Sequence, residues 1–286
     1  MIRLKEPPIT DSEKKIYMEC ANSFEKEKTY AQIALSYIDK VEEYSKNYKR
    51  YVPFNVKNFH HIEMEKEHKK IIEKVYTQKF VPKDSVGNKY YNIIKGNAGG
   101  RCPICGDGKV ANLDHFLPKS KYPLLCVTPI NLVPMCRDCN MAKGAKFSTD
   151  YYEQPFNPYL DEMKDEWVSC KVDFYTDSVC IKYSNGYCKE KNSNMWAKYQ
   201  THMDMHKLDE TFSSRAISEL ENVKGIYRKQ LEQTTKEEVK CSLSEIKKWA
   251  EKIDKNSWRA ALYRALINEI DEFCEWLKII VNYVNQ

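Results

Sequence analysis

Two pairs of cysteines, each with the spacing Cys-x-x-Cys, are the residues of this sequence that point most directly to chemistry. They are Cys102 with Cys105, and Cys136 with Cys139. Each pair presents two sulfur ligands from one tight turn, and two pairs together complete a tetrahedral site for Zn²⁺. The redox alternative, a thioredoxin-like motif, needs one pair in a strand–helix–strand context, which is lacking here. We therefore predict a closed, structural zinc site.

The segment between the two pairs contains polar residues at positions suited to a second site. Asp114 and His115 are adjacent near the end of a short strand-like stretch, where the alternation of side chains between the two faces of a strand stops. Asn131 follows in a proline-flanked loop. Asn140 lies four residues after Cys136, on the same side of a predicted short helix. The zinc site would therefore fix the helix that carries Asn140.

Taken in order, these residues resemble the motif of the HNH endonucleases, the ββα-metal nucleases, in the form stabilised by a four-cysteine zinc site. The resemblance implies that His115 is the general base that activates water and that Asp114 is a ligand of a catalytic divalent ion. It also implies that Asn131 holds the loop and orients the imidazole. Asn140 occupies the place of the last histidine of the motif, which makes this chain resemble an HNN variant with Asn140 as a metal ligand.

These residue types suit phosphodiester hydrolysis. A histidine with a pKa near its ordinary value accepts a proton from water at neutral pH. Oxygen ligands such as those of Asp114 and Asn140 favour a hard ion, Mg²⁺ or Mn²⁺, which stabilises charge on the phosphate and the leaving oxygen. Four basic residues near the motif are predicted to contact flanking phosphates, the alternative being ordinary exposed side chains; they are Arg101, Lys119, Arg137 and Lys143.

Three hypotheses for the function remain open at this point. The first is a metal-dependent endonuclease that hydrolyses nucleic acid, with DNA favoured over RNA. The alternative is a four-cysteine zinc module that binds nucleic acid without cutting it, and such a module has no need of Asp114, His115, Asn131 and Asn140. The long helical flanks resemble effectors of Septu-like anti-phage systems, in which an HNH subunit accompanies an ATPase. This resemblance implies an ATPase or another defence-system subunit as partner. The third hypothesis is therefore an accessory protein whose helices assemble with a partner and whose nuclease centre is latent until assembly.

The elements around the motif are predicted to be mainly helical, in an α+β fold. Apolar residues recur at helical spacing over 11–48, over about 58–79 and again from 195 onward. Residues 150–165 are predicted to form an extended linker, followed by a β-hairpin that begins near Trp167. We thus expect an N-terminal helical region (1–98), an HNH module with zinc knuckles (99–149), and a hairpin followed by C-terminal helices (150–286).

Charge and composition limit the partners and the compartment. Residues 1–100 carry 19 basic and 14 acidic side chains, residues 101–160 carry 7 and 5, and residues 161–286 carry 20 and 22. A polyanion is therefore expected on the first 160 residues. No uncharged apolar run approaches the roughly 20 residues of a membrane helix. The amino terminus lacks the apolar segment of an export signal, so we expect a cytoplasmic protein with no membrane partner.

The other seven of the eleven cysteines have no common spacing. An odd number of cysteines in a chain without an export signal argues against a disulfide framework. We predict that these seven are buried small side chains.

Overall fold

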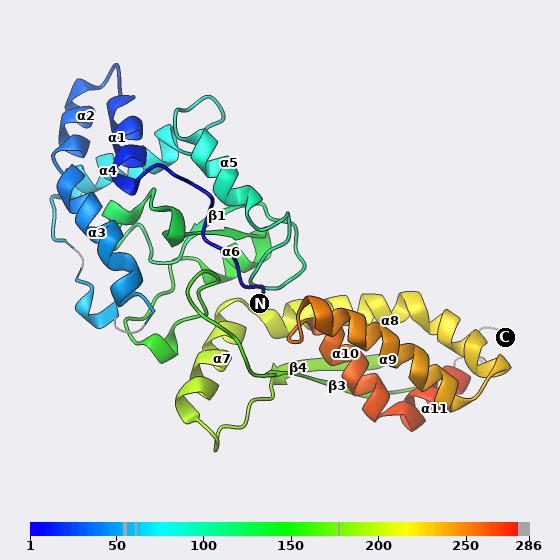
Figure 1. The fold of residues 1–286 in the computed structure, drawn as a ribbon. Helices are drawn as coiled ribbons and strands as arrows, with labels where there is room; N and C mark the ends of the chain where they lie inside the picture. The colour runs from blue at the N-terminus through cyan, green and yellow to red at the C-terminus, as the bar shows by residue number, and fades with distance from the viewer. Residues whose placement is uncertain (54–55, 61, 177, 280–286) are drawn as a thin grey trace. The chain divides into compact units, whose positions relative to one another are not determined.

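The computed structural model describes residues 1–53, 56–60, 62–176 and 178–279. The chain forms two compact units, one from Ile2 to Glu162 and one from Met163 onward that also includes Met1. Among the described residues, each unit contains more helix than strand and one two-stranded antiparallel sheet (Figure 1). The predicted α+β, mainly helical class is confirmed. In the part of the chain that the structure describes, no helix has the length and apolar character needed to cross a membrane.

In its described residues, the N-terminal unit combines five α-helices with a short ββα segment. In chain order its elements are α1 (Glu13–Asn22), α2 (Lys28–Leu35), α3 (Ile38–Tyr51), η1 (Val56–Asn58), α4 (Lys66–Lys79), α5 (Asn88–Gly96), β1 (Asn112–His115), η2 (Pro123–Leu125), η3 (Pro129–Asn131), β2 (Leu132–Met135), α6 (Arg137–Lys143) and η4 (Tyr151–Glu153).

The prediction of one continuous helix over residues 11–48 was wrong, because the chain turns twice within it. At the first turn, the Ser23 hydroxyl donates a hydrogen bond to the Cys20 carbonyl at 2.7 Å. At the second, the Ser36 hydroxyl donates to the Ile33 carbonyl at 2.8 Å. Serine side chains compete for helical carbonyls in this way and favour helix ends. The prediction for 58–79 was also too long, since α4 begins at Lys66.

The hydrophobic core of the N-terminal unit is shared between the helices and the ββα segment. Tyr17 of α1 and Ile72 of α4 belong to one buried cluster with Leu113, Leu124 and Leu132. The residues of the predicted zinc module therefore bury their apolar side chains against the preceding helices. Burial of this kind is the main favourable term in folding.

Residues 144–162 also belong to this unit, so most of the predicted extended linker (150–165) is packed against it. Phe156 and Tyr159 are buried. The Tyr159 hydroxyl donates to the Leu132 carbonyl at 3.0 Å, and the Leu4 amide donates to the Pro158 carbonyl at 2.9 Å. Aromatic side chains in a proline-rich segment pack here without any periodic pattern, so periodicity could not reveal their burial.

The C-terminal unit is built on the predicted hairpin. Its strands pair in antiparallel register, with Val172 opposite Ile181. Helix α8 packs against β4 and helix α10 against β3, so these helices run alongside the hairpin (Figure 1). The elements of this unit are β3 (Val168–Phe174), β4 (Val179–Asn185), α7 (Ser193–Met205), α8 (Leu208–Gln233), α9 (Lys236–Ile253), α10 (Trp258–Asn268) and α11 (Ile270–Ile279).

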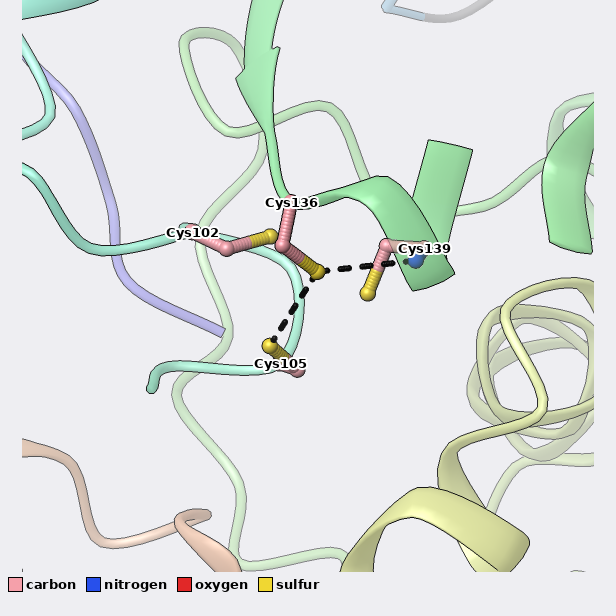
Figure 2. Close-up of side chains that lie close together, drawn as sticks. All are labelled: Cys102, Cys105, Cys136 and Cys139. Carbon is pink, nitrogen blue, oxygen red and sulfur yellow. Dashed lines mark hydrogen bonds between the residues drawn. The ribbon is translucent and has the colours of Figure 1, made fainter. Parts of the chain in front are cut away.

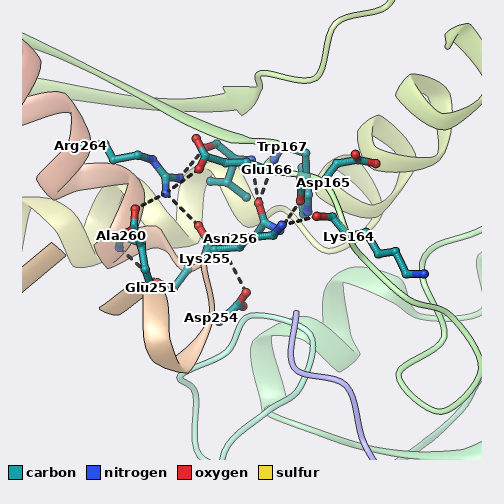
Figure 3. A network of polar contacts seen from close by, with 12 residues as sticks. Lys164, Asp165, Glu166, Trp167, Glu251, Asp254, Lys255, Asn256, Ala260 and Arg264 are labelled. Carbon is teal, nitrogen blue, oxygen red and sulfur yellow. Dashed lines mark hydrogen bonds and ion pairs between the residues drawn. The ribbon is translucent and has the colours of Figure 1, made fainter. Parts of the chain in front are cut away.

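A network of polar contacts joins the start of the hairpin to the turn between α9 and α10 (Figure 3). The side-chain oxygen of Asn256 accepts from the Trp167 amide at 2.8 Å, and its nitrogen donates to the Asp165 carbonyl at 2.8 Å. The guanidinium of Arg264 donates to the Val168 carbonyl at 3.2 Å. These contacts satisfy backbone groups that the strand leaves unpaired, so they fix the hairpin on its helices.

The expectation for the seven remaining cysteines holds only in part. Cys20, Cys126 and Cys274 are buried, whereas Cys188 and Cys241 are exposed. Cys188 lies in the loop after β4, and Cys241 lies on the exposed face of α9. The spacing of the cysteines in the sequence does not indicate either position.

Candidate metal centre and the adjoining polar site

The four cysteines of the two Cys-x-x-Cys pairs come together in the structure and are all buried (Figure 2). Cys102 and Cys105 lie on a tight loop, which the amide of Cys102 closes by donating to the Gly108 carbonyl at 2.7 Å. Cys136 directly follows β2 and Cys139 lies in the first turn of α6. The turn and the helix start therefore present their sulfur atoms to one point.

The distances in this cluster suit a metal ion. The four Sγ atoms lie within 4.8 Å of one another, and the Sγ atoms of Cys105 and Cys136 are 3.9 Å apart. A zinc ion with four sulfur ligands at about 2.3 Å sets neighbouring sulfurs roughly 3.8 Å apart. A disulfide would need about 2.05 Å. Backbone amides also point at the sulfurs, Gly108 at Cys105 and Cys139 at Cys136. The cluster can therefore hold a metal ion such as zinc.

The short strands β1 and β2 and the helix α6 form a ββα arrangement next to this cluster. Asp114 pairs with Val133 across the sheet, and His115, the last residue of β1, pairs with Leu132. Because β2 leads through Cys136 directly into α6, the position of this helix is set by the strand at one side and by the cysteine cluster at its start.

His115 is 7% exposed and is held from two sides. Its Nε2 lies 2.9 Å from the Cys126 carbonyl, and its ring meets the ring of Tyr76 edge-on with centroids 4.4 Å apart. A carbonyl can only accept, so Nε2 is the donor and the neutral ring keeps its lone pair on Nδ1. Burial lowers the pKa of His115 to about 3. The ring is therefore uncharged at neutral pH, but it is a weaker base than the histidine of ordinary pKa that the sequence analysis expected.

Asp114 forms an ion pair with a residue predicted to contact nucleic acid. The ammonium of Lys143 lies 2.7 Å from Asp114 Oδ2 and donates to the His115 carbonyl at 2.9 Å. Burial raises the pKa of Asp114, and the charge of Lys143 opposes that rise. Lys143 is 1% exposed, so its ammonium faces this carboxylate and not the surface, contrary to the phosphate contact expected of it.

Asn131 is fully buried and connects the loop after His115 to the turn before β2. Its side-chain oxygen accepts from the Leu117 amide at 2.8 Å, while its nitrogen lies 3.2 Å from the Leu117 carbonyl and 3.3 Å from that of Leu125. The Phe116 amide also donates to the Asn131 carbonyl at 2.8 Å. One amide side chain thus sets the path of the chain on both sides of this loop.

The structure records fewer contacts for the remaining predicted residues. Asn140 is half-buried on α6, and the structure records no side-chain hydrogen bond from it to Asp114 or His115 among the residues it describes. Arg101 and Arg137 are exposed near the cysteine cluster. Lys119 is half-buried, with its ammonium 5.2 Å from the centre of the Tyr76 ring. Only Lys119 of the predicted basic residues therefore lies on the surface next to His115.

We predict that Lys143→Met destabilises the protein by about 3 kcal/mol, the usual cost of removing one partner from a buried ion pair. The substitution leaves the Asp114 carboxylate without its cation and the His115 carbonyl without a donor. The measurement is urea unfolding, with Lys146→Met as the matched control because Lys146 is exposed three residues later. Equal stability of the two variants would show that the pair contributes little.

Sequence reasoning missed two partners of His115. Tyr76 is one of the apolar residues at helical spacing over 58–79, and nothing in that pattern distinguishes it from its neighbours. The Cys126 carbonyl is a backbone group, so no residue type could have marked it. The pairing of Asp114 with Lys143 joins residues 29 positions apart and depends on how α6 lies against β1.

Comparison with known proteins gives two partial likenesses. The chain is 43% identical over 102 residues to protein ea31 of Escherichia phage lambda, which is 34% of each chain. It is 40% identical over 60 residues to Septu protein PtuB of Bacillus thuringiensis, or 21% of this chain and 23% of that protein. The matched segments thus span about a third or less of these relatives. No family model matches the chain, and no solved structure matches it.

Proposed function

We propose that this protein is a metal-dependent endonuclease of the HNH type that hydrolyses phosphodiester bonds in nucleic acid, with DNA favoured over RNA. The observation that carries the proposal is that Asp114 and His115 end a strand and are joined through Lys143 to a helix that starts at a four-cysteine cluster. A module that only bound nucleic acid would not need a buried histidine and carboxylate held in this way.

His115 is the proposed general base. Its Nε2 is engaged by the Cys126 carbonyl, which leaves Nδ1 as the nitrogen that can take a proton from water. Asn131 acts as a positioning residue, because it fixes the loop that begins directly after His115. The contact with Tyr76 restricts rotation of the imidazole. General bases work only when they are held within hydrogen-bond reach of the proton they accept, and these contacts supply that constraint.

Two ions are proposed, with separate tasks. The four cysteines would hold structural Zn²⁺, a closed site with no position for water. Asp114 and Asn140 would hold Mg²⁺ or Mn²⁺, hard ions that prefer such oxygen ligands. When bound, that ion would stabilise negative charge on the phosphate and the leaving oxygen. Lys143 contacts one oxygen of Asp114, which leaves the other carboxylate oxygen for the ion.

The partial likeness to Septu protein PtuB supports a role in bacterial anti-phage defence. We propose that the protein acts there with a partner, an ATPase or another subunit of the defence system, and that it works in the cytoplasm. The contacts of Lys119 make it the residue best placed to meet a phosphate near His115, and the exposed Arg101 and Arg137 remain proposed contacts farther away.

The test is cleavage of plasmid DNA and of RNA by the full chain with added Mg²⁺ or Mn²⁺. We predict that Asn140→Ala lowers the cleavage rate about 10²-fold, the worth of one electrostatic stabiliser. Zinc content and melting temperature should stay at wild-type values. Asn92→Ala, on the exposed face of α5, is the control. Normal cutting by Asn140→Ala would remove Asn140 from the centre, and binding without any cutting by the wild type would favour the non-catalytic zinc module.

A further inference from the structure

A cavity of about 520 Å³ lies in the N-terminal unit beside the loop that follows His115. Its lining combines aromatic, basic and hydroxyl side chains from three segments of the chain. Among them are Met64, Lys69, Ser120, Lys121, Tyr122 and Phe147. Cavities of about 300–1,000 Å³ are the usual size of sites for small molecules, so the space suits a ligand the size of one nucleotide.

Phe147 provides a fixed aromatic surface in this cavity. Its half-buried ring meets the ring of Tyr122 edge-on, with centroids 5.6 Å apart. Tyr122 is itself buried and stacks on Phe59 with an angle of 10° between the rings. Contacts with Tyr122, which itself packs on Phe59, therefore hold the Phe147 ring in place.

The lining of the cavity carries more positive than negative charge. Lys69 and Lys121 line it, and neither forms an ion pair with any residue that the structure describes. The ammonium of Lys121 lies 5.0 Å from the centre of the Phe147 ring. Glu63 is the one carboxylate among the described lining residues. An anion with a flat apolar part would meet complementary groups here.

The cavity and His115 lie at the two ends of one short loop. The amides of Lys121 and Tyr122 both donate to the Pro118 carbonyl at 2.8 Å, which makes the loop a tight turn. Lys119, inside this turn, reaches the Tyr76 ring that contacts His115. Because only six residues separate His115 from Lys121, the two positions are at most about 20 Å apart, and one nucleic-acid strand can span both.

We propose that this cavity binds one unstacked nucleotide of the nucleic-acid strand next to the cleaved phosphate, with its base against Phe147 and its phosphate on Lys121 and Lys69. The inference rests on the proposed nuclease function and adds that the substrate is single-stranded or opened at this point. Stacking on an aromatic ring accepts any base, so the cavity contributes affinity without sequence specificity.

The test measures binding of a fluorescent oligothymidine that carries one 2-aminopurine to the full chain, without added Mg²⁺ or Mn²⁺. We predict that Phe147→Leu, which keeps the apolar bulk, weakens binding about tenfold and abolishes quenching of the 2-aminopurine. Lys121→Gln should lower the slope of log affinity against log salt by about 0.7. Lys26→Gln, at an exposed lysine between α1 and α2, should bind as the wild type does.

The outcomes separate this proposal from the nuclease function. If Phe147→Leu binds and quenches like the Lys26→Gln control, or if polyglutamate competes as well as the oligonucleotide, the cavity is not a nucleotide site. This holds even when the wild type cuts nucleic acid. If the predicted losses occur but the wild type cuts no substrate with any metal, the cavity stands as a nucleic-acid site and the nuclease function fails.

Discussion

His115→Ala should lower the rate of nucleic-acid cleavage by about 10²–10⁴-fold, the usual contribution of a general base. The imidazole is uncharged, and the contacts with the Cys126 carbonyl and Tyr76 fix which nitrogen can accept a proton. Alanine retains none of these properties. The measurement is the rate of plasmid cleavage under saturating Mg²⁺ or Mn²⁺, compared with the wild type.

Because His115 is buried, the loss of activity must be separated from a loss of fold. His115→Gln keeps a donor for the Cys126 carbonyl and fills most of the space, so it should melt near the wild-type temperature yet still cut slowly. His68→Ala, at a half-buried histidine that contacts Tyr37, is the control for removing an imidazole elsewhere. Added imidazole should partly restore cleavage by His115→Ala. Wild-type rates for both His115 variants would exclude this residue from the mechanism.

Removal of zinc should abolish cleavage and unfold part of the N-terminal unit. Cys102→Ser is expected to reduce the metal content from about one zinc per chain to nearly none, since a closed structural site needs all four ligands. Zinc sites of this kind contribute about 10–16 kcal/mol of binding free energy in small domains, which is folding free energy for the segments they join. Elemental analysis and hydrogen exchange resolved along the chain are the measurements.

The hydrophobic core that the helices share with the ββα segment predicts which segments stay folded when zinc is lost. Hydrogen exchange should accelerate in the Cys102–Cys105 loop and in α6, whereas α1 and α4 keep their protection because they pack on Leu124 and Leu132. Cys20→Ser, at another fully buried cysteine, tests whether the loss of any buried thiol has the same effect. Full zinc content and unchanged exchange in Cys102→Ser would contradict the metal assignment.

Sequence alone was sufficient for those features that depend on local spacing. The two Cys-x-x-Cys pairs predicted a cysteine cluster, and the structure brings the four sulfurs together. Alternation of apolar and polar residues predicted the hairpin of β3 and β4. Helical periodicity predicted the helices but not their ends. Ser23 and Ser36 end two of the helices without changing the spacing of the apolar residues.

The features that could not be predicted are contacts between residues distant in sequence. The partner of Lys143 is set by the packing of α6 on β1, and a lysine near the end of a helix is ordinarily exposed. Burial of His115 follows from Tyr76 on a separate helix. The aromatic wall of the cavity joins Tyr122 to Phe147, 25 residues later in the chain. Nothing in the residue types of these segments specifies such pairings.

Helix α6 is only seven residues long, and its two ends are held by different groups. Cys136 caps the start of the helix from the cysteine cluster, and Lys143 fastens the last turn to Asp114. A helix this short is not stable by itself in water. The cysteine cluster and the Asp114–Lys143 ion pair therefore both depend on the folding of α6. Their stabilities are coupled through this helix, and such coupling is reciprocal. Metal binding at the four cysteines must therefore stabilise the Asp114–Lys143 ion pair. The ion pair, in turn, raises the affinity of the cysteines for the metal by the same coupling free energy.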